Sequence, residues 1–376
     1  MARLRLGLYG TAHFLVDFGC ALLLQGGICP EWDPATAILL YNFLAFAVQM
    51  PLGLLADRYG RCHLFAAAGC LLVVCGWIMP PGLAAVTAAG LGNAAFHVGG
   101  GLHTLNESGN RAGPLGMFVS PGAFGVCLGG VLAGAVSGVS AAVPVPAVMS
   151  GLAMRGLSAG APGSGTVSDL AVRGLTAAAL LPWAVCVVLI LFAVLLWRFG
   201  RGTENVPLAL PKGKIRLWGA AACLLAVVIL RSYLGLAAKL PWKAEFGLLA
   251  VCAMAGGKAA GGYLADRLGV LPTALISLCL SALCFLGSSY PAAGLAALFL
   301  FNMTMPLTLW AAARLFPEMK GFSFGLLTFG LFLGFLPVYF GVSGLASTAL
   351  AAGTMFSLPP LILGIREARG EKGEGK

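Results

Sequence analysis

Two ionisable side chains lie four residues apart in an otherwise apolar stretch near the start of the chain. They are His13 and Asp17, and side chains at this spacing share one face of an α-helix. Asp17 is the only carboxylate deep within any of the long apolar stretches. Ionisable groups are costly inside a membrane and are typical of ion or substrate pathways. The pair therefore predicts a proton-binding site, with a structural His–Asp hydrogen bond as the alternative.

Two cations lie in similarly apolar surroundings in the second half of the chain. Arg231 is flanked by aliphatic residues, and Lys258 lies too far before the next charged turn for its ammonium to reach water easily. Arginine keeps its charge, so Arg231 must face a carboxylate or a polar space. It either binds an anionic solute through a carboxylate or phosphonate or neutralises Asp17, and Tyr233 is placed to add a hydroxyl. Lys258 is a second candidate, with a structural ion pair as the alternative.

Further polar residues interrupt other apolar stretches. His97 is the strongest of them, because histidine titrates near neutral pH. It suits proton coupling, an anion contact or a structural hydrogen bond equally well. Four amide side chains are candidates for lining a polar cavity, although each alone is also typical of a packing hydrogen bond: Asn42, Gln49, Asn93 and Asn302.

The composition indicates that these residues lie in a membrane. The chain has 376 residues, of which 59% are hydrophobic and 10% are charged, and its mean hydropathy is +0.94. Soluble domains carry about 25% charged residues. We therefore expect an all-α polytopic membrane protein, whose backbone groups are satisfied within helices. The 11 cysteines lie mostly in apolar runs and indicate small buried side chains. No cofactor, metal site or nucleic-acid partner is expected, and no enzyme motif is present.

The apolar stretches predict twelve transmembrane helices in two pseudo-symmetric six-helix bundles, 1–198 and 216–366. A cytoplasmic linker is expected at 199–215, a long non-cytoplasmic loop at about 137–173, and a disordered tail at 367–376. The individual helices are expected at about 4–27, 35–56, 63–79, 83–104, 114–136, 174–198, 216–238, 244–265, 270–288, 292–315, 321–340 and 345–365.

A short charged turn occurs at equivalent points of the two halves, which indicates duplication of a helical bundle. The first copy spans 53–61 and the second spans 262–269. Its glycine permits close helix approach, and its aspartate can pair with an arginine or cap a neighbouring helix. A turn that only sets topology is the alternative. The residues expected to form a gate are Gly53, Asp57, Arg58, Gly60 and Arg61 in the first copy, and Gly262, Asp266 and Arg267 in the second.

The distribution of basic residues predicts the orientation. Cytoplasmic segments carry an excess of lysine and arginine. With both termini in the cytoplasm, only four basic residues fall in outside segments: Arg155, Arg173, Lys239 and Lys243. The inside segments then hold Arg3, Arg5, Arg58, Arg61, Arg111, Arg198, Arg201, Lys212, Lys214, Arg216, Arg267, Arg314, Lys320, Arg366, Arg369, Lys372 and Lys376. Both charged turns fall on the cytoplasmic side.

Two six-helix halves, a basic linker and the repeated turn resemble the major facilitator superfamily of transporters. The resemblance covers nearly the whole chain, and it implies that the turn latches the two halves on the cytoplasmic side when the carrier faces outward. Three short segments are similar to signatures of fosmidomycin-resistance-type exporters: Ala12-His13-Phe14-Leu15-Val16-Asp17, Ala95-Phe96-His97 and Leu230-Arg231-Ser232-Tyr233.

One departure from that subfamily concerns proton coupling. The subfamily pattern continues after the histidine with proline and an acidic residue, whereas Val98-Gly99-Gly100 follows His97 here. A coupling role for that acidic residue has no counterpart at this position. The glycine-rich stretch 122–130 resembles a degraded form of the glycine motif of drug:proton antiporters.

The sequence as a whole predicts a secondary active transporter of the cytoplasmic (inner) membrane. It is expected to work as a monomer by alternating access and to export a small anionic or amphiphilic solute in exchange for protons. The alternative is a facilitator or importer of an organic anion or lysolipid, and a non-transporting receptor or scaffold is the third interpretation.

Overall fold

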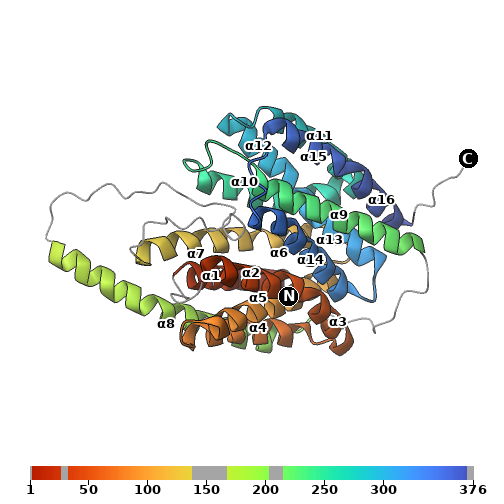
Figure 1. Cartoon of the computed structure of the whole chain (residues 1–376). Coiled ribbons are helices and arrows are strands. Elements are labelled where there is room, and N and C mark those ends of the chain that lie inside the picture. Colours follow the sequence, from red (N-terminus) through yellow and green to blue (C-terminus); the bar gives the residue numbers. More distant parts are fainter. Residues whose placement is uncertain (1, 27–32, 138–166, 203–214, 371–376) are drawn as a thin grey trace, which may run out of the picture.

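The computed structural model describes residues 2–26, 33–137, 167–202 and 215–370. Apart from one isolated bridge between Ala238 and Leu345, the regular structure in these ranges is helical (Figure 1). The first half comprises α1 (Ala2–Gln25), α2 (Pro34–Asn42), η1 (Phe43–Ala47), α3 (Gln49–Tyr59), α4 (Cys62–Ile78), α5 (Leu83–Glu107), α6 (Gly113–Val119), α7 (Pro121–Ser137) and α8 (Val167–Phe199). The second half comprises α9 (Ile215–Ala237), α10 (Gly247–Leu268), α11 (Val270–Leu286), α12 (Pro291–Asn302), α13 (Thr304–Leu315), α14 (Lys320–Tyr339), α15 (Ser347–Phe356) and α16 (Leu358–Arg369).

The helices have the length and composition of membrane spans. Among the described residues, nine helical stretches are long and apolar enough to cross a bilayer, and α4 and α11 are shorter apolar helices. This confirms the all-helical, multi-pass membrane class expected from the composition. Several predicted spans are built from two helices in succession, namely α6 with α7, α12 with α13, and α15 with α16. A π-helical segment, η1, lies between α2 and α3.

Two predicted boundaries were wrong. The helix α8 begins at Val167, inside the segment expected to be a loop, because its alanine- and leucine-rich start favours helix. The helix α16 continues to Arg369, past the expected start of the tail at 367. Basic residues in its last turn complement the helix dipole, and Gly370 ends it with a positive φ of 71°. Residues 138–166 of the predicted loop, most of the linker and the tail from 371 lie outside the described residues.

The helix α5 is buried along most of its length and positions the polar centre of the first half. It packs against α1, α3 and α4. Small residues make this possible, because a side chain at Gly69 of α4 or at Gly92 or Gly99 of α5 would overlap backbone of the facing helix. Contacts between the two halves run from α3 to α14, from α6 to α10 and from α7 to α10.

Candidate functional site

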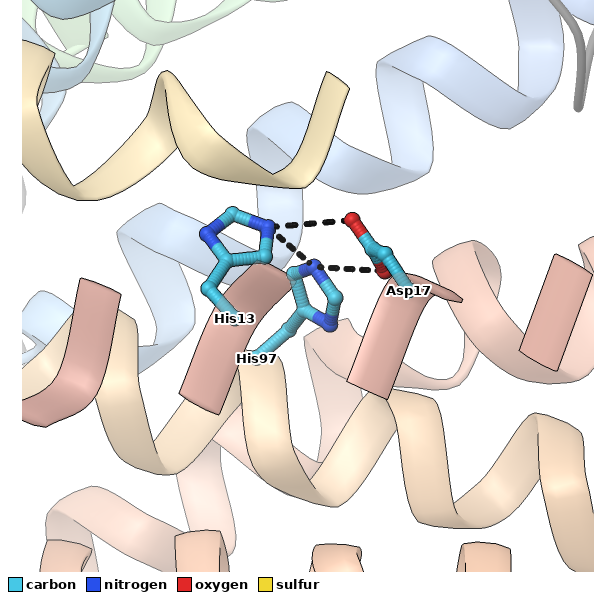
Figure 2. A group of neighbouring side chains, drawn as sticks. All are labelled: His13, Asp17 and His97. Carbon is cyan, nitrogen blue, oxygen red and sulfur yellow. Dashed lines mark hydrogen bonds and ion pairs between the residues drawn. The ribbon is translucent and has the colours of Figure 1, made fainter. Parts of the chain in front are cut away.

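The polar centre of the first half is a cluster of His13, Asp17 and His97 (Figure 2). The first two residues come from α1 and the third from α5. His13 Nε2 lies 3.2 Å from Asp17 Oδ2, and His97 Nε2 lies 3.6 Å from Asp17 Oδ1. The two Nε2 atoms are 2.9 Å apart. Both histidines are buried, so the crossing of α1 and α5 joins two candidates that the sequence suggested separately.

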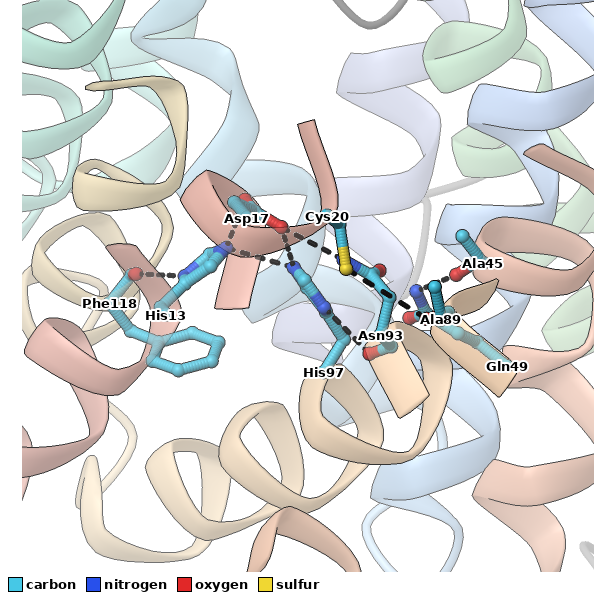
Figure 3. A network of polar contacts seen from close by, with 9 residues as sticks. All are labelled: His13, Asp17, Cys20, Ala45, Gln49, Ala89, Asn93, His97 and Phe118. Carbon is cyan, nitrogen blue, oxygen red and sulfur yellow. Dashed lines mark hydrogen bonds and ion pairs between the residues drawn. The ribbon is translucent and has the colours of Figure 1, made fainter. Parts of the chain in front are cut away.

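The other nitrogen of each ring is fixed by the backbone (Figure 3). His13 Nδ1 lies 2.7 Å from the carbonyl oxygen of Phe118, and His97 Nδ1 lies 2.9 Å from that of Asn93. A carbonyl oxygen only accepts hydrogen bonds, so each Nδ1 carries a hydrogen and each Nε2 is left to face the cluster. Asn93 Nδ2 also donates to Asp17 Oδ1 at 3.0 Å.

This arrangement requires a positive charge. Two Nε2 lone pairs 2.9 Å apart repel one another unless a proton or another cation lies between them. Asp17 adds a negative charge at the same place, and burial strengthens its attraction for a cation. The donor atoms of His13, Asp17 and His97 are therefore chemically suited to a proton or another cation.

Glycines of α7 allow that helix to cover the cluster. A Cβ atom at Gly122 would overlap the Asp17 carboxylate and the His13 ring, and one at Gly125 would overlap the α1 backbone at Phe14. The glycine-rich stretch 122–130 thus provides the surface of α7 that lies against α1.

Arg231 and Lys258, the two candidate cations of the second half, form no ion pair with a carboxylate in the described part of the chain. Arg231 of α9 is buried, and its Nη1 lies 3.4 Å from the hydroxyl oxygen of Thr308 on α13. Lys258 of α10 is half-buried. The ion pair of Arg231 with Asp17, one of the two predicted alternatives, is not formed in this conformation. Tyr233 is half-buried on the same helix.

The predicted amides divide into two groups. Asn93 belongs to the cluster through its bond to Asp17. Asn42, Gln49 and Asn302 each donate to the carbonyl four residues earlier in their own helix, which is the packing role that the sequence left open. The oxygen atoms of Asn42, Gln49 and Asn93 are nevertheless buried without a hydrogen-bond partner in the described part of the chain.

The aspartates of the two charged turns cap helices of the opposite half. Asp57 accepts hydrogen bonds from the backbone N–H groups of Gly321 and Phe322, both at 2.8 Å, at the start of α14. Asp266 accepts from those of Ala112 at 2.7 Å and Gly113 at 3.0 Å, at the start of α6. A carboxylate at a helix N-terminus satisfies free N–H groups and complements the helix dipole. Two roles were predicted for the aspartate, pairing with an arginine and capping a neighbouring helix. In this conformation it caps a helix.

The turn residues differ from expectation in one respect. Asp57 and Asp266 lie in the last turn of α3 and α10 and not beyond the helix end. Gly60 follows α3 with a positive φ of 68°, a conformation that favours glycine.

The arginines of the turns are exposed and do not pair with the aspartates. Arg58 and Arg61 lie at the surface, and no ion pair within the described ranges includes them. Arg267 stacks over the ring of Tyr263 at 4.4 Å from its centroid. The predicted pairing of Asp57 with these arginines is thus replaced by its bonds to α14.

Each aspartate is preceded four residues earlier by a glycine at the closest point of the same contact. A Cβ atom at Gly53 would overlap the carbonyl group of Gly321, and one at Gly262 would overlap that of Ala112. The repeated glycine and aspartate thus form two equivalent contacts between the halves.

Replacement of Asp57 by alanine is expected to free the amides at the start of α14. Loss of a helix cap costs about 1–2 kcal/mol, so hydrogen exchange at Gly321 and Phe322 should become roughly 5- to 30-fold faster. Asp266→Ala is the matched control and should accelerate exchange at Ala112 and Gly113 instead. Unchanged hydrogen exchange at the start of α14 in Asp57→Ala would show that the cap does not stabilise this helix end.

Replacement of Gly53 by alanine is expected to destabilise the protein. Its methyl group would overlap the Gly321 carbonyl, and overpacking of this kind costs about 1–3 kcal/mol. Gly219 is an exposed helical glycine whose Cβ would meet nothing within 4 Å. Gly219→Ala should therefore stabilise by up to about 1 kcal/mol through helix propensity. Thermal unfolding of the two variants should shift in opposite directions, and an equal shift would refute the close contact.

Comparison with solved structures decides the fold. The chain is similar to the E. coli fucose:proton symporter, with a TM-score of 0.61, 12% identity and coverage of 99% of both chains. It is similar to the human organic anion transporter MFSD10, with a TM-score of 0.61, 14% identity and coverage of 96% and 99%. A second structure of the fucose symporter FucP, described as a major facilitator superfamily transporter in the outward conformation, matches with a TM-score of 0.60, 13% identity and 98% coverage of both chains. The chain has the major facilitator fold. No family model matches the sequence, and no curated protein matches it.

Within the major facilitator fold, the candidates form two groups on different elements. The cluster of His13, Asp17 and His97 lies on α1 and α5, while Arg231 and Lys258 lie on α9 and α10. Thr308, the hydrogen-bond partner of Arg231, was not predicted from the sequence. The available signal was a pair of threonines, Thr304 and Thr308, four residues apart within an apolar run.

Proposed function

We propose that the protein is a secondary active transporter that moves a small anionic solute by alternating access. The major facilitator fold shared with a fucose:proton symporter and an organic anion transporter supports transport as the activity. The observation that supports an anionic substrate is the burial of the Arg231 guanidinium, whose described polar partner is the hydroxyl of Thr308.

The physical argument for an anion is charge balance. A buried arginine keeps its charge, and a charge without a partner is costly in a low-dielectric interior. A carboxylate or phosphonate of the solute would balance Arg231 through two parallel hydrogen bonds. Lys258 would add a second positive charge, and Tyr233 a hydroxyl. An amphiphilic solute is compatible with this site, because the surroundings of Arg231 are apolar.

We further propose that transport is coupled to protons at the cluster of His13, Asp17 and His97. The paired Nε2 atoms provide a position for one proton beside the Asp17 carboxylate. Its location on α1 and α5, apart from Arg231 on α9, permits coupling through a change in helix packing. Residues Asn42, Gln49, Asn93 and Asn302 are proposed to line the solute path.

The proposed architecture has twelve spans in two six-helix halves, with both termini in the cytoplasm of an inner membrane and a single copy as the working unit. The capped contacts at Asp57 and Asp266 would then form the cytoplasmic gate of the outward-facing state, and Arg58, Arg61 and Arg267 would stabilise other states of it. Export in exchange for protons is the proposed direction, by resemblance to fosmidomycin-resistance-type exporters. A facilitator or importer of an organic anion or lysolipid is the second candidate, which the absence of an acidic residue after His97 favours.

Ligand-dependent unfolding tests the proposal before any substrate is known. The purified protein is expected to be stabilised by some members of a panel of carboxylates, phosphonates and lysolipids, and not by matched neutral compounds. Compounds that stabilise it would then be tested for uptake into proteoliposomes with and without a pH gradient. Stabilisation by neutral compounds alone would contradict the anionic substrate, and transport that ignores the pH gradient would identify a facilitator.

A further inference from the structure

The cluster of His13, Asp17 and His97 has the donor set and spacing of a transition-metal site. Its three ligand atoms, two imidazole Nε2 atoms and a carboxylate oxygen, lie within 4.8 Å of one another. The two Nε2 atoms are 2.9 Å apart, and Asp17 offers Oδ2 to His13 at 3.2 Å and Oδ1 to His97 at 3.6 Å. With metal–ligand bonds of about 2.0–2.2 Å, neighbouring ligands of one ion lie roughly 2.9–3.5 Å apart. The His13–His97 and His13–Asp17 pairs thus already lie at such distances, and the His97–Asp17 pair lies slightly beyond them.

The atoms around the ligands support the same assignment. A metal-binding histidine usually donates its second N–H to a carbonyl or carboxylate, which fixes the tautomer and the ring orientation. His13 does so to Phe118 O and His97 to Asn93 O. Asn93 orients the carboxylate through its own N–H, and Gly122 allows α7 to cover the site. Both histidines therefore present an unprotonated Nε2 toward the common centre.

We propose that this cluster binds a divalent first-row transition-metal ion such as Zn²⁺, in competition with the proton assigned to it above. Imidazole and carboxylate ligands suit zinc, iron, cobalt and nickel. Three protein ligands leave a coordination position open, as in sites that exchange a ligand or release an ion. The metal ion here is cargo or a coupling ion, and its binding excludes the shared proton because metal ligands must be deprotonated.

One nearby charge opposes the metal ion and provides a second test. Lys258 lies on α10, which packs against α7, the helix that covers the cluster, and its positive charge acts on Asp17 and His97. A cation in the cluster is therefore destabilised by the Lys258 ammonium, and by less if an anionic solute lies beside it. The metal ion and the anionic solute would then each bind more tightly when the other is bound. Replacing Lys258 by methionine should strengthen metal binding, which a merely structural role of Lys258 does not predict.

The test is a Zn²⁺ titration of the full-length protein, purified in detergent and stripped with a chelator, against a competing fluorescent chelator at constant pH. Wild type is expected to bind one Zn²⁺ per chain and to unfold at a higher temperature when it is bound. His97→Gln is expected to weaken binding by about 100-fold or more, and Asn93→Ala by about 10- to 100-fold. The matched control is His103→Gln, which replaces another buried histidine of α5 outside the cluster and should bind as wild type does.

The variants keep every cysteine, so zinc held by cysteine would survive in all of them. Equal affinity in wild type and His97→Gln would overturn the proposal, as would a wild type that leaves all Zn²⁺ with the competitor. If Zn²⁺ does not bind at the cluster, persistence of pH-driven transport would show that the cluster binds only the proton. Binding of organic anions through Arg231 is measured separately without Zn²⁺, so failure of the metal site leaves the test of the anion site intact.

Discussion

Replacement of Arg231 by alanine is expected to weaken binding of the anionic solute by about 10- to 150-fold, because a hydrogen-bonded charge contributes about 1.5–3 kcal/mol. The guanidinium is buried, and its one described hydrogen-bond partner is neutral. Its removal therefore eliminates the charge that a carboxylate or phosphonate would balance. The measurement is the shift in unfolding temperature as a function of anion concentration, followed by uptake into proteoliposomes.

The matched control for Arg231 lies on the same helix. Arg216 is exposed at the start of α9, and Arg216→Ala should leave anion binding unchanged. Arg231→Lys should restore part of the affinity, since lysine keeps the charge but not the two-pronged geometry. Full anion binding by Arg231→Ala would contradict the assignment of the anion site. Because a buried arginine without an anion is destabilising, the alanine variant without ligand should be at least as stable as wild type.

Replacement of Asp17 by asparagine is expected to abolish accumulation driven by a pH gradient, with a loss of at least about 100-fold. Asparagine has nearly the same shape and can still accept from Asn93 and contact His13, as Asp17 does now. The change therefore removes the negative charge while leaving the packing in place. The cluster then lacks the negative charge that would attract a proton to the space between His13 and His97.

A transport assay without a pH gradient separates the loss of proton coupling from misfolding. Counterflow, in which labelled solute exchanges for unlabelled solute with no pH gradient, should survive in Asp17→Asn because Arg231 is unchanged. Asp33→Asn replaces an exposed carboxylate that precedes α2 and serves as the control with normal pH-driven transport. Normal proton-driven transport by Asp17→Asn would refute proton coupling at this cluster.

The sequence predicted those features that depend on local spacing. His13 and Asp17 share a helix face, so their contact follows from the helical repeat alone. The repeated glycine and aspartate at 53–57 and 262–266 followed from direct comparison of the two halves. Helix positions followed from apolar length, and the errors at Val167 and Arg369 fall where helices extend beyond the apolar stretch.

Contacts between distant helices were not predictable in the same way. That His97 Nε2 meets His13 Nε2 depends on how α1 crosses α5, and nothing in either segment encodes that geometry by itself. The residues of the cluster come from two helices, so no local spacing of histidines in the sequence indicates their contact. The choice of backbone amides over arginines as partners of Asp57 likewise depends on where α14 begins.

Counterflow in proteoliposomes tests anion transport by alternating access through Arg231. Proteoliposomes holding wild type or Arg231→Ala are loaded with an unlabelled organic anion that stabilises the purified protein, and entry of the labelled anion is followed without a pH gradient. We predict saturable counterflow by wild type and about 10-fold or greater loss in Arg231→Ala at low anion concentration. Equal counterflow by both proteins, or none by wild type with any stabilising anion, would contradict the account.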